Sequence, residues 1–373
     1  MADALADELG AMAGMLSFDG FINMMDMIMM AHFVGFSVVG SGGELAELSM
    51  SAQTGLYLYL LVPLVALMIG GFVSAKQNAH FGVFERFNLS VVIGAVYGAV
   101  LAVFSLFAGT SMALDMGEFG GPGMDIAVSG QYSFFAALWH GFLLGTIFSF
   151  FGALMQFGPP KVTSHLSGRL TYGESLHQAI STVIRGVLLS VFVLLVVFLV
   201  QFGGEVFDDT FMFIVLLTQL GGYLWVLLNF IPFSMSADMF GESGALNVSV
   251  LSGFEAVGEM GDTAVLNDYG IYLYLGLLLP IALFLWAGYR IRLQVKGDVL
   301  KAVLAFSGTY ALLMAALATL TAFSFEMNAG SLGVGAEMLE VSIGFGFFTT
   351  LFISFITASL LTYAGTLFVK AEE

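Results

Sequence analysis

The sequence predicts an all-α polytopic membrane protein, with about seven transmembrane helices plus two re-entrant or interfacial segments in a tandem parallel repeat. Apolar residues make up 59% of the 373 residues and charged residues only 10%, against roughly a quarter in soluble domains. Several apolar stretches exceed the roughly 20 residues that cross the hydrocarbon core of a bilayer. The repeat is predicted from two similar apolar segments, one in each half of the chain.

Seven apolar segments are predicted to form crossing helices, because each is long and contains few charged residues. They cover residues 56–75, 89–109, 132–156, 181–202, 271–289, 300–324 and 341–369. Two further segments, 15–39 and 211–235, are apolar but are interrupted by polar residues, glycine or proline. Their position therefore depends on the topology of the helices around them.

The distribution of charge predicts which loops are cytoplasmic. All ten Lys and Arg residues lie in or beside 76–88, 157–185, 290–301 and the C-terminus, whereas most Asp and Glu residues lie elsewhere. Loops rich in Lys and Arg stay on the cytoplasmic side of the membrane. We therefore expect a multi-pass protein of the cell membrane, with acidic loops outside and the C-terminus in the cytoplasm.

This topology places both ends of segment 211–235 outside, because the helix before it leaves the cytoplasm and helix 271–289 returns to it. A single crossing is then excluded. We expect a re-entrant or membrane-surface hairpin broken at Gly221-Gly222, with its irregular backbone covered by protein. The alternative is a crossing followed by a weakly apolar return within residues 243–266.

Two similar segments predict an internal duplication. TGLYLYLLVPLV begins at Thr54 and YGIYLYLGLLLPIA begins at Tyr269, and a shift of 217 positions brings Pro63 onto Pro280. Periods of this size in membrane proteins indicate repeated helical bundles. We expect a first membrane repeat at 1–158, a cytoplasmic connector and linking transmembrane helix at 159–205, and a second membrane repeat at 206–373.

Small residues recur at every fourth position in two helices of each half. Helices in lipid associate through close approach at such residues, so helix packing is the main interpretation. The alternative is a hydroxyl-lined path in the second half, along Thr350, Ser354, Ala358, Thr362 and Thr366. The packing candidates are Gly94, Gly98, Gly141 and Gly145 and, at the 217-residue shift, Ala311, Ala315 and Ala358.

The sequence contains no catalytic or cofactor motif that we could identify. It has no cysteine, no HExxH zinc motif and no phosphate-binding loop. We therefore expect no enzyme activity, no catalytic residues, no cofactor and no metal. The expected partners are the lipid bilayer and either a second copy of the chain or another membrane protein, with no nucleic acid.

Polar residues within the membrane segments are the candidate functional residues, because ionisable groups in hydrocarbon are costly and usually face a cavity or a partner. Asp26 paired with His140 is a candidate proton or cation relay. The alternative places Asp26 and His32 near the outer interface, with His140 hydrogen-bonded to a neighbouring helix. The full set of pathway candidates is Asp26, His32, His140, Gln219 and Asn229.

The net charge of −17 has two interpretations. A surface rich in acids and poor in lysine keeps a protein hydrated in multimolar salt, which indicates a halophilic archaeon. Alternatively, external acids attract cations towards a pathway. The acids are spread over every external loop, which favours the halophilic interpretation.

The segment AHFVGFSVV at 31–39, with the acidic loops and the multi-span layout, resembles a group of uncharacterised haloarchaeal multi-pass membrane proteins. In that group an asparagine usually precedes the Ala-His-Phe-Val run, and this chain has Met30 at that position. The group has no established activity, so the resemblance adds no site residues.

Two classes of function follow. The first is a small-solute or ion transporter or channel with a pathway between the two repeats, favoured by the duplication and the polar residues. The second is a non-catalytic membrane scaffold or accessory subunit of a larger complex, favoured by the scarcity of intramembrane charge. Substitution of His140 or Asp26 separates them, because a pathway residue affects activity and a packing residue affects the yield of folded protein.

Overall fold

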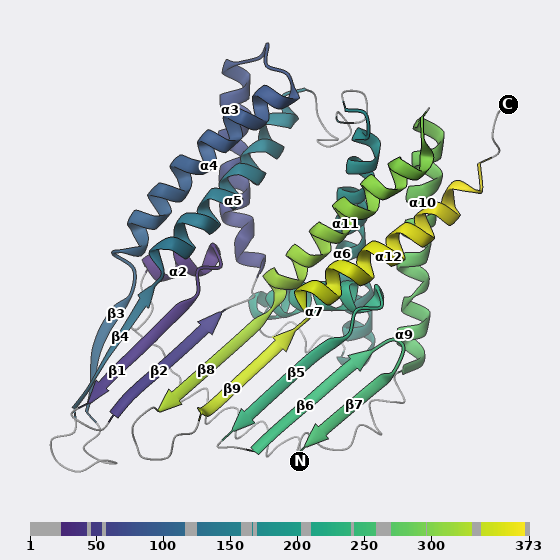
Figure 1. Ribbon diagram of the computed structural model, residues 1–373. Helices are drawn as coiled ribbons and strands as arrows, with labels where there is room; N and C mark the ends of the chain where they lie inside the picture. The colour runs from purple at the N-terminus through teal and green to yellow at the C-terminus, as the bar shows by residue number, and fades with distance from the viewer. Residues whose placement is uncertain are drawn as a thin grey trace.

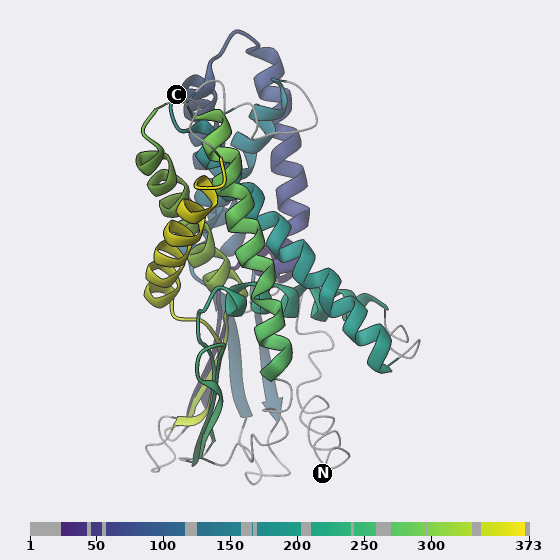
Figure 2. The same cartoon turned by 90° about the vertical axis from the view of Figure 1, so that its right-hand side faces the viewer.

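A computed structural model shows helices at one end of the molecule and a broad β-sheet at the other (Figure 1). In a view turned by 90°, the sheet is seen on edge as a single layer (Figure 2). The structure describes residues 24–42, 46–53, 57–115, 125–157, 166, 170–202, 210–239, 242–258, 270–295, 297–329 and 337–369. Residues 15–23 of the first interrupted segment lie outside this set.

Within the described residues, six helical segments are long and apolar enough to cross a membrane, which supports a multi-span integral membrane protein. Helix α3 (Leu61–Gln77), also predicted to cross, has 17 residues. At 1.5 Å per residue it is about 26 Å long, slightly shorter than the bilayer core unless η2 (Tyr57–Leu60) extends it. The six are α4 (Val83–Ser105), α5 (Phe134–Met155), α6 (Gly173–Phe202), α9 (Gly270–Gly276) with α10 (Leu278–Gln294), α11 (Val299–Thr321) and α12 (Phe347–Thr366).

The sheet was not predicted, so the all-helical prediction applies to the membrane segments alone. Nine antiparallel strands lie in the order β3-β4-β1-β2-β8-β9-β5-β6-β7. The strands are β1 (Phe36–Gly42), β2 (Ala46–Gln53), β3 (Thr110–Asp115), β4 (Asp125–Tyr132), β5 (Phe233–Met239), β6 (Glu242–Ser249), β7 (Gly253–Gly258), β8 (Phe323–Ala329) and β9 (Glu337–Gly344).

Most strands form hairpins inserted between helices at equivalent places in the two halves. Hairpin β1–β2 follows α2 (Met24–Ala31), and β3–β4 connects α4 to α5. In the second half, β5–β6 follows α7 (Thr210–Leu228), and β8–β9 connects α11 to α12. Pairing of β2 with β8 joins the halves into one sheet. The order helix, hairpin, two helices, hairpin, helix therefore occurs twice.

Helix α7 corrects one prediction. It is a single helix from Thr210 to Leu228, so the predicted break at Gly221-Gly222 is wrong. Gly221 instead allows close approach to α6, because an added Cβ would lie 2.3 Å from a methyl carbon of Val191. Helix α7 lies at the boundary between the helices and the sheet and leads into β5 (Figure 1).

Glycines bring α4 and α5 into backbone contact. A Cβ added to Gly94 would lie 2.6 Å from the Phe142 carbonyl oxygen, and one added to Gly145 would lie 2.8 Å from Gly94 Cα. Gly98 and Gly141 make a second contact of this kind, one turn along the helices. In the second half, the proposed packing residues Ala311, Ala315 and Ala358 are buried.

Equivalent close contacts also define how the halves correspond. They align α3 with α10 at a shift of 217 positions, but α5 with α12 at a shift of 213. The predicted shift of 217 for the last helix is thus wrong by four residues, about one helical turn. Gly145, and not Gly141, therefore corresponds to Ala358. The contacts are Gly71 with Ser149, Gly288 with Thr362, Gly152 with Met68, and Gly365 with Leu285.

The strands alternate between an apolar and a polar face. In β5, Phe233 and Met235 point to the face on which Leu273 of α9 and Val248 join the largest buried cluster. Ser236, on the other face, shares a hydrogen bond of 2.8 Å with Ser342 of β9. Alternation of this kind gives a sheet with one face packed and the other solvated.

The polar face carries three carboxylates in one cross-strand row. Glu326 pairs with Glu340 across β8 and β9, and Glu340 pairs with Asp238 across β9 and β5. Like charges directly opposite each other destabilise a sheet, and salt screens exposed charges. The stability of these strands should therefore increase with salt concentration.

We expect Glu340→Gln to raise the stability of the folded protein at low salt by about 0.5–1 kcal/mol, because it removes two like-charge contacts. Thermal unfolding at low and at multimolar salt measures this gain, which should shrink as salt increases. Glu255→Gln is the matched control, since Glu255 lies opposite the neutral Asn247. An equal gain from both substitutions would contradict the prediction.

We also expect Gly98→Ala to destabilise the protein by roughly 1–3 kcal/mol through overpacking. The added Cβ would lie 2.6 Å from the Leu138 carbonyl oxygen, which belongs to the backbone and cannot rotate away. Gly70→Ala serves as the control, because no atom lies within 4 Å of its added Cβ. Unfolding in detergent that fails to distinguish the two variants would refute the close α4–α5 contact.

Candidate functional site

The ends of α2 and α7 have the same local geometry. Each is followed by a phenylalanine with positive φ, at 56° for Phe33 and 65° for Phe230. Positive φ is uncommon for a residue with a side chain. The strands β1 and β5 begin three residues later, at Phe36 and Phe233. The segments HFVGFS from His32 and NFIPFS from Asn229 therefore occupy equivalent positions, which the sequence analysis did not identify.

In the first half, a histidine occupies the position before this phenylalanine. His32 is only 5% exposed. Its Nδ1 lies 2.6 Å from the carbonyl oxygen of Ile28, and its Nε2 bonds the hydroxyl of Tyr97 on α4. A carbonyl can only accept a hydrogen bond, so Nδ1 carries the hydrogen. Nε2 of the neutral ring then accepts the hydrogen bond of the Tyr97 hydroxyl.

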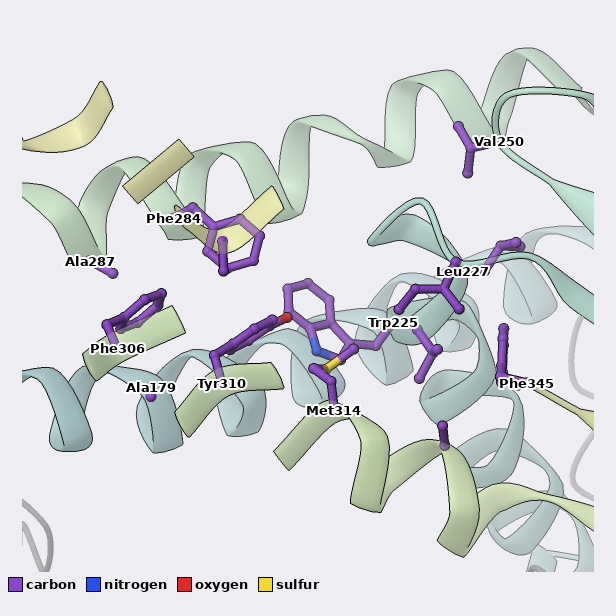
Figure 3. Packing of buried hydrophobic residues seen from close by; sticks show 14 of the residues in the cluster. Ala179, Trp225, Leu227, Val250, Phe284, Ala287, Phe306, Tyr310, Met314 and Phe345 are labelled. Atoms are coloured by element: carbon purple, nitrogen blue, oxygen red, sulfur yellow. The ribbon is translucent and has the colours of Figure 1, made fainter. Parts of the chain in front are cut away.

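In the second half, the neutral amide of Asn229 makes the equivalent hydrogen bonds. Asn229 is 1% exposed; it donates to the Trp225 carbonyl at 2.7 Å and accepts from the Tyr310 hydroxyl at 2.9 Å. The Tyr310 hydroxyl lies beside the Trp225 indole nitrogen in the buried core (Figure 3). Tyr310 follows Tyr97 by 213 positions, the same shift that relates α12 to α5. This junction is therefore stable with no ionisable pair.

Asp26 and Tyr223 are a second equivalent pair, and both secure the point where a long helix becomes a strand. The Asp26 carboxylate accepts the Gly109 backbone N–H at 2.8 Å, just before β3. Burial, and then the neighbouring Asp26 carboxylate, raise the pKa of Tyr132, so its hydroxyl stays protonated as a donor to Asp26. Tyr223 donates to the Thr321 carbonyl at 2.7 Å, just before β8.

Gln219 takes part in the same junction of the second half. Its Nε2 donates to the Thr321 carbonyl at 2.8 Å, so this oxygen accepts from both Gln219 and Tyr223. One side chain is an amide and the other a phenol. The two second-half candidates, Gln219 and Asn229, thus lie along α7 in a wholly neutral hydrogen-bond network.

Helix α5 brings His140 to the first-half junction. The His140 ring lies beside the backbone carbonyls of His32 and Phe33, within electrostatic range of the His32 ring. Its Nδ1 is buried and has no hydrogen-bond partner among the described residues. The structure therefore places His140 beside the backbone of His32 and Phe33, whereas Asp26 bonds Gly109. Among the described residues it gives no contact between Asp26 and His140.

Tyrosines complete the site, and sequence analysis did not identify them. Tyr97 and Tyr310 bond the residue before the positive-φ phenylalanine, and Tyr132 and Tyr223 act at the helix-to-strand junctions. Among the described residues, no group of three or more His, Asp or Glu side chains is arranged to hold a metal ion. The chemistry available at the first-half site is proton binding and hydrogen bonding.

Comparisons with known proteins give no family assignment: no family model, no curated protein and no solved structure matches the chain.

We expect Asp26→Leu to destabilise the protein by about 1–3 kcal/mol, because the half-buried Gly109 N–H loses this acceptor. Asp26→Asn should lose less stability, since the amide oxygen can still accept that hydrogen bond. Unfolding of the two variants in detergent, compared with the wild type, measures both losses. Equal stability of Asp26→Leu and the wild type would show that the hydrogen bond contributes nothing.

Proposed function

We propose that the protein transports a small solute or ion across the cell membrane, as a transporter or channel. One observation carries the proposal: the first-half junction holds buried ionisable residues where the second half holds neutral ones. Asn229 with Tyr310 meets the structural need of this junction with neither a histidine nor a carboxylate. The fold therefore does not require His32 at the equivalent position.

Ionisable residues buried next to apolar membrane helices are costly, and such residues mark ion or substrate pathways. His140 adds to that cost, because its buried Nδ1 makes no hydrogen bond among the described residues. An apolar residue there would remove the cost. A binding role explains why His140 lies against His32.

The pathway is proposed to run between two tandem repeats. The repeated element order and the equivalent Phe33 and Phe230 support a duplication. Phe33 packs in one cluster with Leu60, Phe148 and Leu320, and Leu320 belongs to the second half. The end of α2 thus borders the other repeat. With α3 extended by η2, the repeats and α6 make seven crossings.

The sheet is proposed to lie outside the cell and the C-terminus in the cytoplasm. Lys76, Arg292 and Lys301 lie at helix ends opposite the sheet, which supports this orientation by the positive-inside rule. The acidic row on the sheet supports the halophilic archaeal setting of the group that segment 31–39 resembles.

The nine-stranded sheet favours a second candidate, a non-catalytic scaffold or accessory subunit. Its polar face and the strands β3 and β7, which form its edges within the described residues, suit contact with a second copy or another membrane protein. A scaffold needs no ionisable pair at this position, however, so the buried His32 and the half-buried His140 favour transport.

Flux of common cations, anions and small solutes into proteoliposomes at high salt tests the proposal. We expect flux with the wild type and a loss to the level of empty vesicles with His140→Ala, because His140 lies at the pathway. His80→Ala is the control, since His80 is an exposed histidine at the opposite end of the helices. Folded wild-type protein that moves none of these species would support the scaffold.

A further inference from the structure

The two histidines of the first-half site differ in their hydrogen-bond surroundings. His32 is fully bonded as a neutral ring, with Nδ1 donating to Ile28 and Nε2 accepting from Tyr97. A second proton would have to occupy Nε2, and Tyr97 would then lose its acceptor. The neutral form of His32 is therefore the one that its neighbours stabilise.

His140 has the opposite surroundings. Its ring lies beside the carbonyls of His32 and Phe33, which can accept hydrogen bonds and cannot donate them. Its Nδ1 is buried without a partner among the described residues. A protonated imidazole has two N–H donors and suits a site made of acceptors. The added proton is therefore better placed on His140 than on His32.

The pair holds one proton at most. The apolar Met29, Val34 and Ala137 form one buried cluster at this junction, and positive charges on both rings would repel each other. The other titratable groups at the site are Asp26 on α2, Tyr97 on α4 and Tyr132 at the end of β4. Asp26 is the acid among these named groups, and its carboxylate accepts the Gly109 N–H.

We propose that the site binds a proton on His140 beside a neutral His32, so that transport is proton-conducting or proton-coupled. This inference rests on the proposed transport function. The step makes one bond, between the proton and a ring nitrogen of His140, and release breaks the same bond. A proton needs neither a cavity nor a set of ligands, which fits a His140 ring beside backbone carbonyls and a His32 ring bonded to a tyrosine hydroxyl.

Nitrogen-15 NMR of histidine-labelled protein in detergent tests the binding step. From about pH 5 to about pH 8, we expect one buried histidine to titrate and another to stay neutral with hydrogen on Nδ1. His140→Gln should remove the titrating buried signal, and His80→Gln should remove only an exposed one. Titration of His32 with His140 neutral throughout, or protonation of both rings, would overturn the proposal.

Flux driven by a pH gradient in proteoliposomes tests the coupling. We expect a loss to the level of empty vesicles with His140→Gln and full flux with His80→Gln. His32→Asn provides a variant that should fold, because Asn229 and Tyr310 make the same bond in the second half. We expect its neutral amide to preserve the fold.

The outcomes separate this inference from the proposed function. Solute flux that does not depend on the pH gradient, and that persists in His140→Gln, would support the transport function and overturn the proton site. Titration of His140 in a protein that carries no flux would keep the proton site and overturn the transport function.

Discussion

The fold depends on satisfying the backbone where membrane helices turn into strands. At those points a peptide group belongs neither to a helix nor to a ladder, and little water is available to replace the missing partner. The short helices α2 and α7 supply the partners from their side chains. Asp26 accepts the Gly109 N–H, and Gln219 with Tyr223 donates to the Thr321 carbonyl. The sheet can begin at the membrane boundary because these bonds are made.

Both junctions bond backbone groups where a helix becomes a strand, but they use different side chains. That difference indicates which residues the fold requires. An amide and phenols are enough in the second half, where Asn229 is fully bonded. The first half instead has Asp26, His32 and His140 near its junction, and among the described residues the buried Nδ1 of His140 has no hydrogen-bond partner. A comparison between equivalent positions within one chain thus separates what the fold requires from what it does not.

Much of the membrane part could be predicted from sequence, because hydropathy and charge act residue by residue. The sheet could not: its strands are short, and their alternating Ser and Glu residues resemble polar loops. The four-residue error, which aligned Gly141 instead of Gly145 with Ala358, arose because a stripe of period four maps onto itself after one turn. Arg86 was interpreted only as a topology marker, yet it is buried and bonds the carbonyl of Ala153 at 2.8 Å.

The sheet also constrains how a transporter with this fold could move. Among the described residues, the main contacts between the two halves are the β2–β8 ladder and the packing of η2 on α7. Both lie at the sheet side of the helices. Six residue pairs from Leu48–Ala329 to Gln53–Ser324 hold that ladder in register. Sliding it would break several hydrogen bonds at once, whereas rocking about it breaks none. Relative motion of the two bundles would therefore pivot at the sheet and open furthest at the helix ends opposite it.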